Sequence, residues 1–183
     1  MTWLVDGADE QDSWARIEAL APAGVGALTD LHGSFWHLVD PVVLELCRLR
    51  IATLLGAEAE ARLRSEWARA AGLTEEKIAA LPAWPTSALF SAAERACLAL
   101  TEQFMVDVNG VTSDQTDGVL EHFSTQECYA FVNALWSFEQ FQRICLVLGV
   151  TPTAEQAGLT MPPATEAGRT MGAETAHTAQ EDP

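Results

Sequence analysis

Residues 40–56 read DPVVLELCRLRIATLLG, a run in which apolar side chains fall on every face of a helix. Asp40 is a typical N-cap, Pro41 fits a first helical turn that needs no N–H partner, and Gly56 is a typical C-terminal stop. A helix that is apolar all round lies at the centre of a protein. We therefore expect a central helix over residues 41–55, interrupted only by these polar side chains: Glu45, Arg48, Arg50 and Thr53.

Glu45 stands in the middle of this apolar run, so we expect it to be mostly buried. A buried carboxylate must be paired, or its pKa must rise until it holds a proton. Two interpretations follow for Glu45. It forms a structural ion pair with Arg48 or with Arg50, or it serves as a functional acid or base.

The rest of the chain repeats the three- and four-residue spacing of apolar side chains, without the sustained alternation of a strand. The pattern predicts an all-α protein of about seven or eight helices. Ser91 with Glu94, and Ser124 with Glu127, form the capping-box pattern of a helix start. The other expected helices cover residues 13–20, 25–39, 57–71, 74–81, 91–108, 113–123 and 124–149.

The length of 183 residues suits a single domain, which we place at residues 1–150. Residues 151–183 form a C-terminal tail rich in Thr, Ala, Pro and Glu, with few large apolar side chains. Such a tail cannot offset the entropy lost on ordering. It is therefore expected to be disordered unless Leu159 and Met161 dock on a neighbouring surface.

The chain carries 10 basic and 26 acidic residues, a formal net charge of −16. Nucleic acids and anionic membrane surfaces would repel it, so neither is an expected partner. No run approaches the roughly 20 apolar residues of a membrane span, and the start of the chain is acidic, unlike a secretory leader. We expect a cytoplasmic protein.

The four cysteines lie far apart in apolar helical surroundings, with no CxxC pair and no nearby histidine. They are Cys47, Cys97, Cys128 and Cys145. This pattern is typical of reduced thiols in a core, and it predicts no zinc site or other metal site.

The run E-L-x-x-L-R-x-A-x-L-x-G at residues 45–56 resembles the start of the carboxymuconolactone decarboxylase and alkylhydroperoxidase D superfamily. The resemblance continues through residues 70–74, 91–100, 122–127 and 138–149. It implies an alkylhydroperoxidase D-like helical bundle. In the decarboxylase branch it also implies acid–base chemistry by His and carboxylate groups, without metal or organic cofactor.

The chain departs from the superfamily where the peroxidases carry their reactive groups. The thiol peroxidases have C-x-x-C-x-x-x-H after the glycine, and these three positions are Ala57, Glu60 and Arg64 here. A subfamily without cysteines reads approximately Y-E-W-x-x-H, of which this chain keeps only Glu60. The resemblance therefore predicts a divergent member that is not a thiol peroxidase.

We expect a cofactor-independent enzyme that decarboxylates, eliminates from or isomerises a small, partly apolar substrate. The catalytic candidates are Glu45, Glu60, Arg64 and His37, and the substrate-binding candidates are Trp36 and Arg48. The alternative is an inactive member that acts as an oligomeric binding or scaffold protein. A separate alternative holds for Glu58 and Glu60, that both only decorate the surface. They lie in a helical first turn that favours acidic residues, and Glu60 stands four residues before Arg64. An enclosed cavity where Glu45, Glu60 and Arg64 converge would favour the enzyme, whereas Arg64 filling that space in a closed ion pair would favour the scaffold.

Six tryptophans and seven phenylalanines exceed what one small core needs, so we expect a homo-oligomer with an apolar interface. The resemblance points the same way, because superfamily members are usually oligomers. The candidate interface residues are Trp136, Phe138 and Phe141, and the acidic stretch from Glu102 to Glu127 should lie mostly outside the interface.

Overall fold

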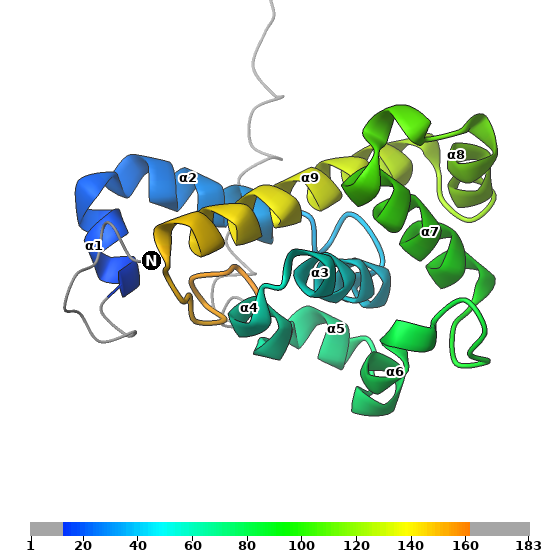
Figure 1. The fold of residues 1–183 in the computed structure, drawn as a ribbon, viewed down its shortest axis with the longest axis horizontal. Helices are drawn as coiled ribbons and strands as arrows, with labels where there is room; N and C mark the ends of the chain where they lie inside the picture. Colours follow the sequence, from blue (N-terminus) through cyan, green and yellow to red (C-terminus); the bar gives the residue numbers. More distant parts are fainter. Residues whose placement is uncertain (1–12, 162–183) are drawn as a thin grey trace, which may run out of the picture.

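A computed structural model describes residues 13–161, which form only helices, turns and loops (Figure 1). The predicted all-α fold is confirmed. No helix within these residues is both long and apolar enough to cross a membrane. The α-helices are α1 (Ser13–Leu20), α2 (Pro22–Gly33), α3 (Pro41–Leu55), α4 (Glu58–Arg62), α5 (Glu66–Ala70), α6 (Glu75–Ala79), α7 (Ala92–Val106), α8 (Ser113–Leu120) and α9 (Thr125–Leu148).

Helix α3 lies at the centre of the domain and packs against α4, α5, α7 and α9. Its ends are those that the sequence predicts. The Asp40 carboxylate accepts a hydrogen bond from the Val42 N–H, and Gly56 ends the helix at a φ of 68°. Because Gly56 has no Cβ, it adopts this left-handed conformation without strain. Most of α3 is buried, and Glu45 is only 1% exposed, as predicted.

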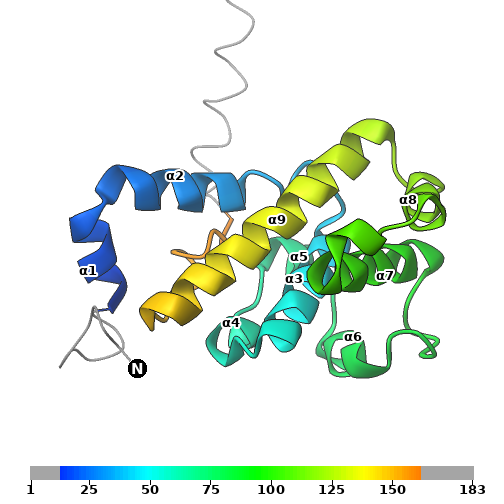
Figure 2. The same cartoon turned by 45° about the horizontal axis from the view of Figure 1, so that its top comes forward.

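Helices α1 and α2 form an arm that extends along the C-terminal half of α9 (Figure 2). The expected helix 25–39 was wrong at both ends, because α2 begins at Pro22 and ends at Gly33. Proline is well suited to the first helical position, where its missing N–H costs nothing. At the other end the Ser34 hydroxyl donates to the Leu31 carbonyl, which satisfies one of the last carbonyls of α2.

The expected helix 57–71 is divided into α4 and α5 by an extended turn at residues 63–65. Leu63 has a ψ of 153°, and Ser65 caps α5 by accepting from the Ala68 N–H. The turn exposes the Leu63 carbonyl and the Ser65 N–H to buried charged groups of α3. Polar contacts with α3 therefore replace the helical hydrogen bonds that the local sequence favours.

The predicted capping boxes are both present, Ser91 with Glu94 at α7 and Ser124 with Glu127 at α9. Helix α9 presents different faces to the core and to solvent. Phe138 and Phe141 are fully buried inside the protomer, so both were wrong as interface candidates. Trp136 is 49% exposed, and Tyr129 and Val132 share its exposed face at helical spacing.

The packed structure continues beyond residue 150, where we expected the domain to end. Leu159 is fully buried, and its carbonyl accepts from the Glu66 N–H at 2.9 Å. The Trp67 indole N–H donates to the Thr160 carbonyl at 3.2 Å. Residues 151–161 thus belong to the folded unit, whereas residues 1–12 and 162–183 lie outside the described residues.

Candidate functional site

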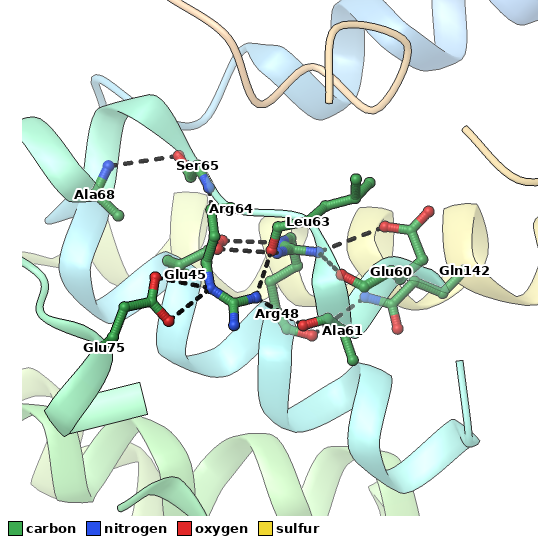
Figure 3. A network of polar contacts seen from close by, with 10 residues as sticks. All are labelled: Glu45, Arg48, Glu60, Ala61, Leu63, Arg64, Ser65, Ala68, Glu75 and Gln142. Atoms are coloured by element: carbon green, nitrogen blue, oxygen red, sulfur yellow. Dashed lines mark hydrogen bonds and ion pairs between the residues drawn. The ribbon is translucent and has the colours of Figure 1, made fainter. Parts of the chain in front are cut away.

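Arg48 lies in the centre of α3 and is completely buried. Its guanidinium uses all five N–H groups (Figure 3). Nε and Nη2 donate to the two carboxylate oxygens of Glu45 at 2.7 and 2.9 Å, and Nη2 also donates to the Leu63 carbonyl at 3.0 Å. Nη1 donates to the Glu60 carbonyl at 3.0 Å and to Glu60 Oε2 at 3.4 Å. Burial acts to lower the pKa of Arg48, but Glu45 and Glu60 more than offset this, so Arg48 stays charged.

Glu45 is held entirely by this network. Besides its two bonds from Arg48, its Oε1 accepts from the Ser65 N–H at 3.1 Å. Of the two partners considered for Glu45, the structure therefore shows Arg48. Arg50 instead pairs with Glu102 at 2.6 Å. Three hydrogen-bond donors hold this carboxylate in place, which makes Glu45 a structural and positioning group.

Glu60 is also buried, at 2% exposure, but only one of its carboxylate oxygens is paired. Oε2 faces Arg48, whereas Oε1 has no hydrogen-bond partner and turns away from the guanidinium (Figure 3). Burial raises the pKa of Glu60 to about 7, with Arg48 opposing the rise and Glu45 adding to it. Glu60 can therefore take up or release a proton near neutral pH.

A cavity of about 210 Å³ lies beside Glu60, between α4, the C-terminal end of α9 and residues 149–152. Its lining includes Ala57, Gln142 and Cys145. In the resemblance drawn from the sequence, Ala57 and Glu60 stand at the positions where the thiol peroxidases carry their two cysteines. The cavity lies beside both positions.

Gln142 belongs to this site although the sequence did not indicate it. Its amide N–H donates to the Arg48 carbonyl at 3.2 Å, which fixes the orientation of the amide group. Its Oε1 is buried and has no hydrogen-bond partner. The sequence offers no signal that singles it out, because Gln140 and Arg143 beside it are polar as well.

The other candidates lie apart from this cluster. His37 is exposed, and Arg64 turns to Glu75 at 3.2 Å. Arg64 therefore does not converge with Glu45 and Glu60, and Arg48 takes the central place instead. Trp36 is 1% exposed and stacks on Phe138, with ring centroids 5.6 Å apart, so it belongs to the core. Arg48 is too deeply buried, and too fully paired, to meet a substrate directly.

The cysteine thiols and the His32 ring are uncharged at neutral pH. All four cysteines are free, and burial raises the pKa of Cys47 to about 12 and the pKa of the other three above its usual value. His32 is buried against Phe138 and Phe141, and burial lowers its pKa to about 3, so its ring stays neutral. No cluster of side chains suited to a metal ion occurs within residues 13–161.

Comparisons with known proteins identify a matching family model and a structure with the same fold. The model of the carboxymuconolactone decarboxylase family matches residues 26–103, which include α3, α4 and Glu60. Residues 26–103 therefore carry the sequence pattern of the carboxymuconolactone decarboxylase family. The fold is shared with the crystal structure of an Agrobacterium tumefaciens protein of unknown function, proposed to be the antioxidant defence protein AhpD. That chain is 20% identical, with a TM-score of 0.65 over 73% of this chain and 92% of the other. No protein of curated function matches the sequence.

Proposed function

We propose that the protein is a cofactor-independent enzyme of the carboxymuconolactone decarboxylase-like type, in which Glu60 carries the proton. One observation supports this most directly. A buried carboxyl group, with one oxygen unpaired and a pKa of about 7, borders a cavity large enough for part of a small molecule. A general acid or base works best when its pKa lies near the working pH, and a perturbed carboxyl group in a cavity is typical of such a residue.

In this proposal the rest of the polar network positions Glu60. Arg48 holds Glu60 by Oε2 and by its carbonyl, and Glu45 holds Arg48 by two hydrogen bonds. Oε1 is left to exchange a proton with a substrate carbon or oxygen, in a decarboxylation, an elimination or an isomerisation. The buried cysteines supply no thiolate at neutral pH, which argues against a thiol peroxidase.

A second candidate has support of its own. The Arg48 guanidinium has no free N–H, and Glu45 is saturated, so the centre of the site is a closed ion pair. A superfamily member that had lost catalysis would keep such a pair for stability and serve as an oligomeric binding or scaffold protein. The cavity beside Glu60 would then bind a small molecule without changing it.

Proton exchange in D₂O separates the two functions, whichever of the three reactions the enzyme catalyses. A set of small lactones, keto acids and enolisable ketones is incubated with the protein, and NMR follows deuterium incorporation and loss of substrate. We expect exchange or turnover with the wild type, a large loss with Glu60→Gln, and no loss with Glu76→Gln. Glu76 is a matched control because it makes the same change of charge on α6, where it is exposed and does not line the cavity. Equal activity of Glu60→Gln and wild type would contradict the proposed role of Glu60.

A further inference from the structure

The side chains around the Glu60 cavity offer acceptors rather than positive charge. Glu60 Oε1 and Gln142 Oε1 are both buried without a hydrogen-bond partner, and both residues line the cavity. Glu58 also lines it, and no Lys, Arg or His is among the lining residues of the described chain. A buried oxygen without a partner costs free energy that a bound donor would recover. The cavity therefore suits a ligand group that donates hydrogen bonds.

The nearest arginine side chains are not placed to bind an anionic ligand in the cavity. Arg48 lies behind Glu60, with all its N–H groups occupied by Glu45, Glu60 and Leu63. Arg64 is turned away to Glu75, and Arg62 pairs with Glu58. A carboxylate ligand would face Glu58 and Glu60 in a chain of net charge −16. Carboxylates in the lining therefore disfavour the binding of an anion.

A second, apolar groove adjoins the cavity. It has a volume of about 300 Å³ and lies between α1, α2 and α9, lined by side chains such as Trp14, Leu28 and Phe141. Cys145 lines both the groove and the Glu60 cavity. The Cys145 thiol is uncharged, because burial and Glu60 raise its pKa, so it offers an apolar surface to both spaces. The groove holds an apolar group of about ten heavy atoms, taking about 30 Å³ for each water-sized group.

We infer that the two spaces bind the two ends of one small molecule, an aliphatic or aromatic alcohol or amine. Its hydroxyl or amino group donates to Glu60 Oε1 and Gln142 Oε1, and its hydrocarbon part lies in the groove beside Cys145. This inference rests on the proposed function, since it assigns the substrate class of the same site. Because such a substrate has no carboxylate to lose, the inference favours elimination or isomerisation over decarboxylation. It differs from the small acidic lactone that the decarboxylase branch of the superfamily uses.

A matched ligand series tests the inference with the full chain. Hexanol, hexylamine, hexanoate and ethylamine are titrated calorimetrically into the protein near pH 8, where Glu60 is mostly charged. We expect hexanol and hexylamine to bind more tightly than hexanoate by about tenfold or more, as expected for one hydrogen bond to a charged group. Hexylamine should also bind more tightly than ethylamine, because only its longer chain fills the groove. Equal or tighter binding of hexanoate, or no dependence on chain length, would overturn the inference.

Two variants, each with a control, test which part of the site binds each end of the ligand. Glu60→Gln should weaken the binding of hexylamine by about tenfold or more, through loss of a charged acceptor. Glu76→Gln, on the exposed side of α6 and outside the cavity lining, should leave the binding nearly unchanged. Leu28→Trp fills the groove and should weaken hexanol and hexylamine alike, whereas Leu120→Trp, on the exposed side of α8, should not. If Leu28→Trp does not fold, the comparison of hexylamine with ethylamine on the wild type still tests whether the hydrocarbon part lies in the groove. Binding without proton exchange would contradict the proposed function alone, and turnover of a carboxylate substrate would contradict this inference alone.

Discussion

Replacing Arg48 by methionine tests the polar network at its centre. Arg48→Met keeps an unbranched side chain in α3 but leaves Glu45 and Glu60 buried without their cation. Breaking a buried ion pair by removing one partner costs about 3–5 kcal/mol. For a chain of this length each kcal/mol lowers Tm by about 2–4 °C, so the expected fall is roughly 6–20 °C.

The loss should also depend on pH in a defined direction. Without Arg48, the buried Glu45 and Glu60 carboxyl groups have no cation beside them, so burial favours their protonated, uncharged forms in the folded protein. The variant is therefore least destabilised at acidic pH and most destabilised above pH 7. Thermal denaturation followed by circular dichroism at about pH 5 and pH 8 measures both effects.

The matched control is Arg62→Met, which removes an exposed pair with Glu58 and should change Tm little. A combined variant, Glu45→Gln with Arg48→Met and Glu60→Gln, should recover part of the lost stability, because no charge is left buried. If Arg48→Met were as stable as Arg62→Met at both pH values, the reasoning about the buried network would be refuted.

Three further predictions concern Glu60, the cysteines and the assembly. The pKa of Glu60 rises from 4.5 to about 7 on folding, so its stabilising proton is present below pH 4.5 and lost as the pH rises through 7. Between pH 5 and pH 8, wild type should lose about 2–3 kcal/mol of unfolding free energy that Glu60→Gln keeps; urea denaturation that shows parallel curves would contradict this. Changing all four cysteines to serine should leave any peroxide turnover unchanged in a peroxidase assay, because burial raises the pKa of every thiol; loss of activity in Cys47→Ser with an intact fold would argue against it. The exposed apolar face at Trp136 leads us to expect a homo-oligomer, and sedimentation at micromolar concentration showing only a species near 19.8 kDa would exclude it.

The sequence predicts α3 well because the information for it is local. Asp40, Pro41 and Gly56 specify the ends of α3, and its apolar side chains bury Glu45. The choice between Arg48 and Arg50 as the partner of Glu45 is not local. It depends on which side of α3 meets α4 and which side meets Glu102 on α7, and this follows only from the packed structure.

The features that the sequence failed to predict all depend on contacts between distant segments. The break at residues 63–65 is formed because Leu63 and Ser65 bind the charged groups of α3, against a locally helical pattern. Helix α9 carries aromatic residues on several faces, and only the positions of α1, α2 and α3 decide that Phe138 and Phe141 are buried. The Glu60 cavity likewise needs α9 and residues 149–152 beside α4.

The protonation of Glu60 is the central claim, and it can be measured directly. With ¹³C-labelled glutamate, the side-chain carboxyl signal that disappears in Glu60→Gln is assigned to Glu60 and followed by NMR from pH 3 to pH 9. The structure predicts that this signal titrates with a pKa of about 7, because the carboxyl group is buried and only one oxygen meets Arg48. A titration near the ordinary value of 4.5 would show a solvated carboxylate and would contradict the assignment of Glu60 as the proton carrier.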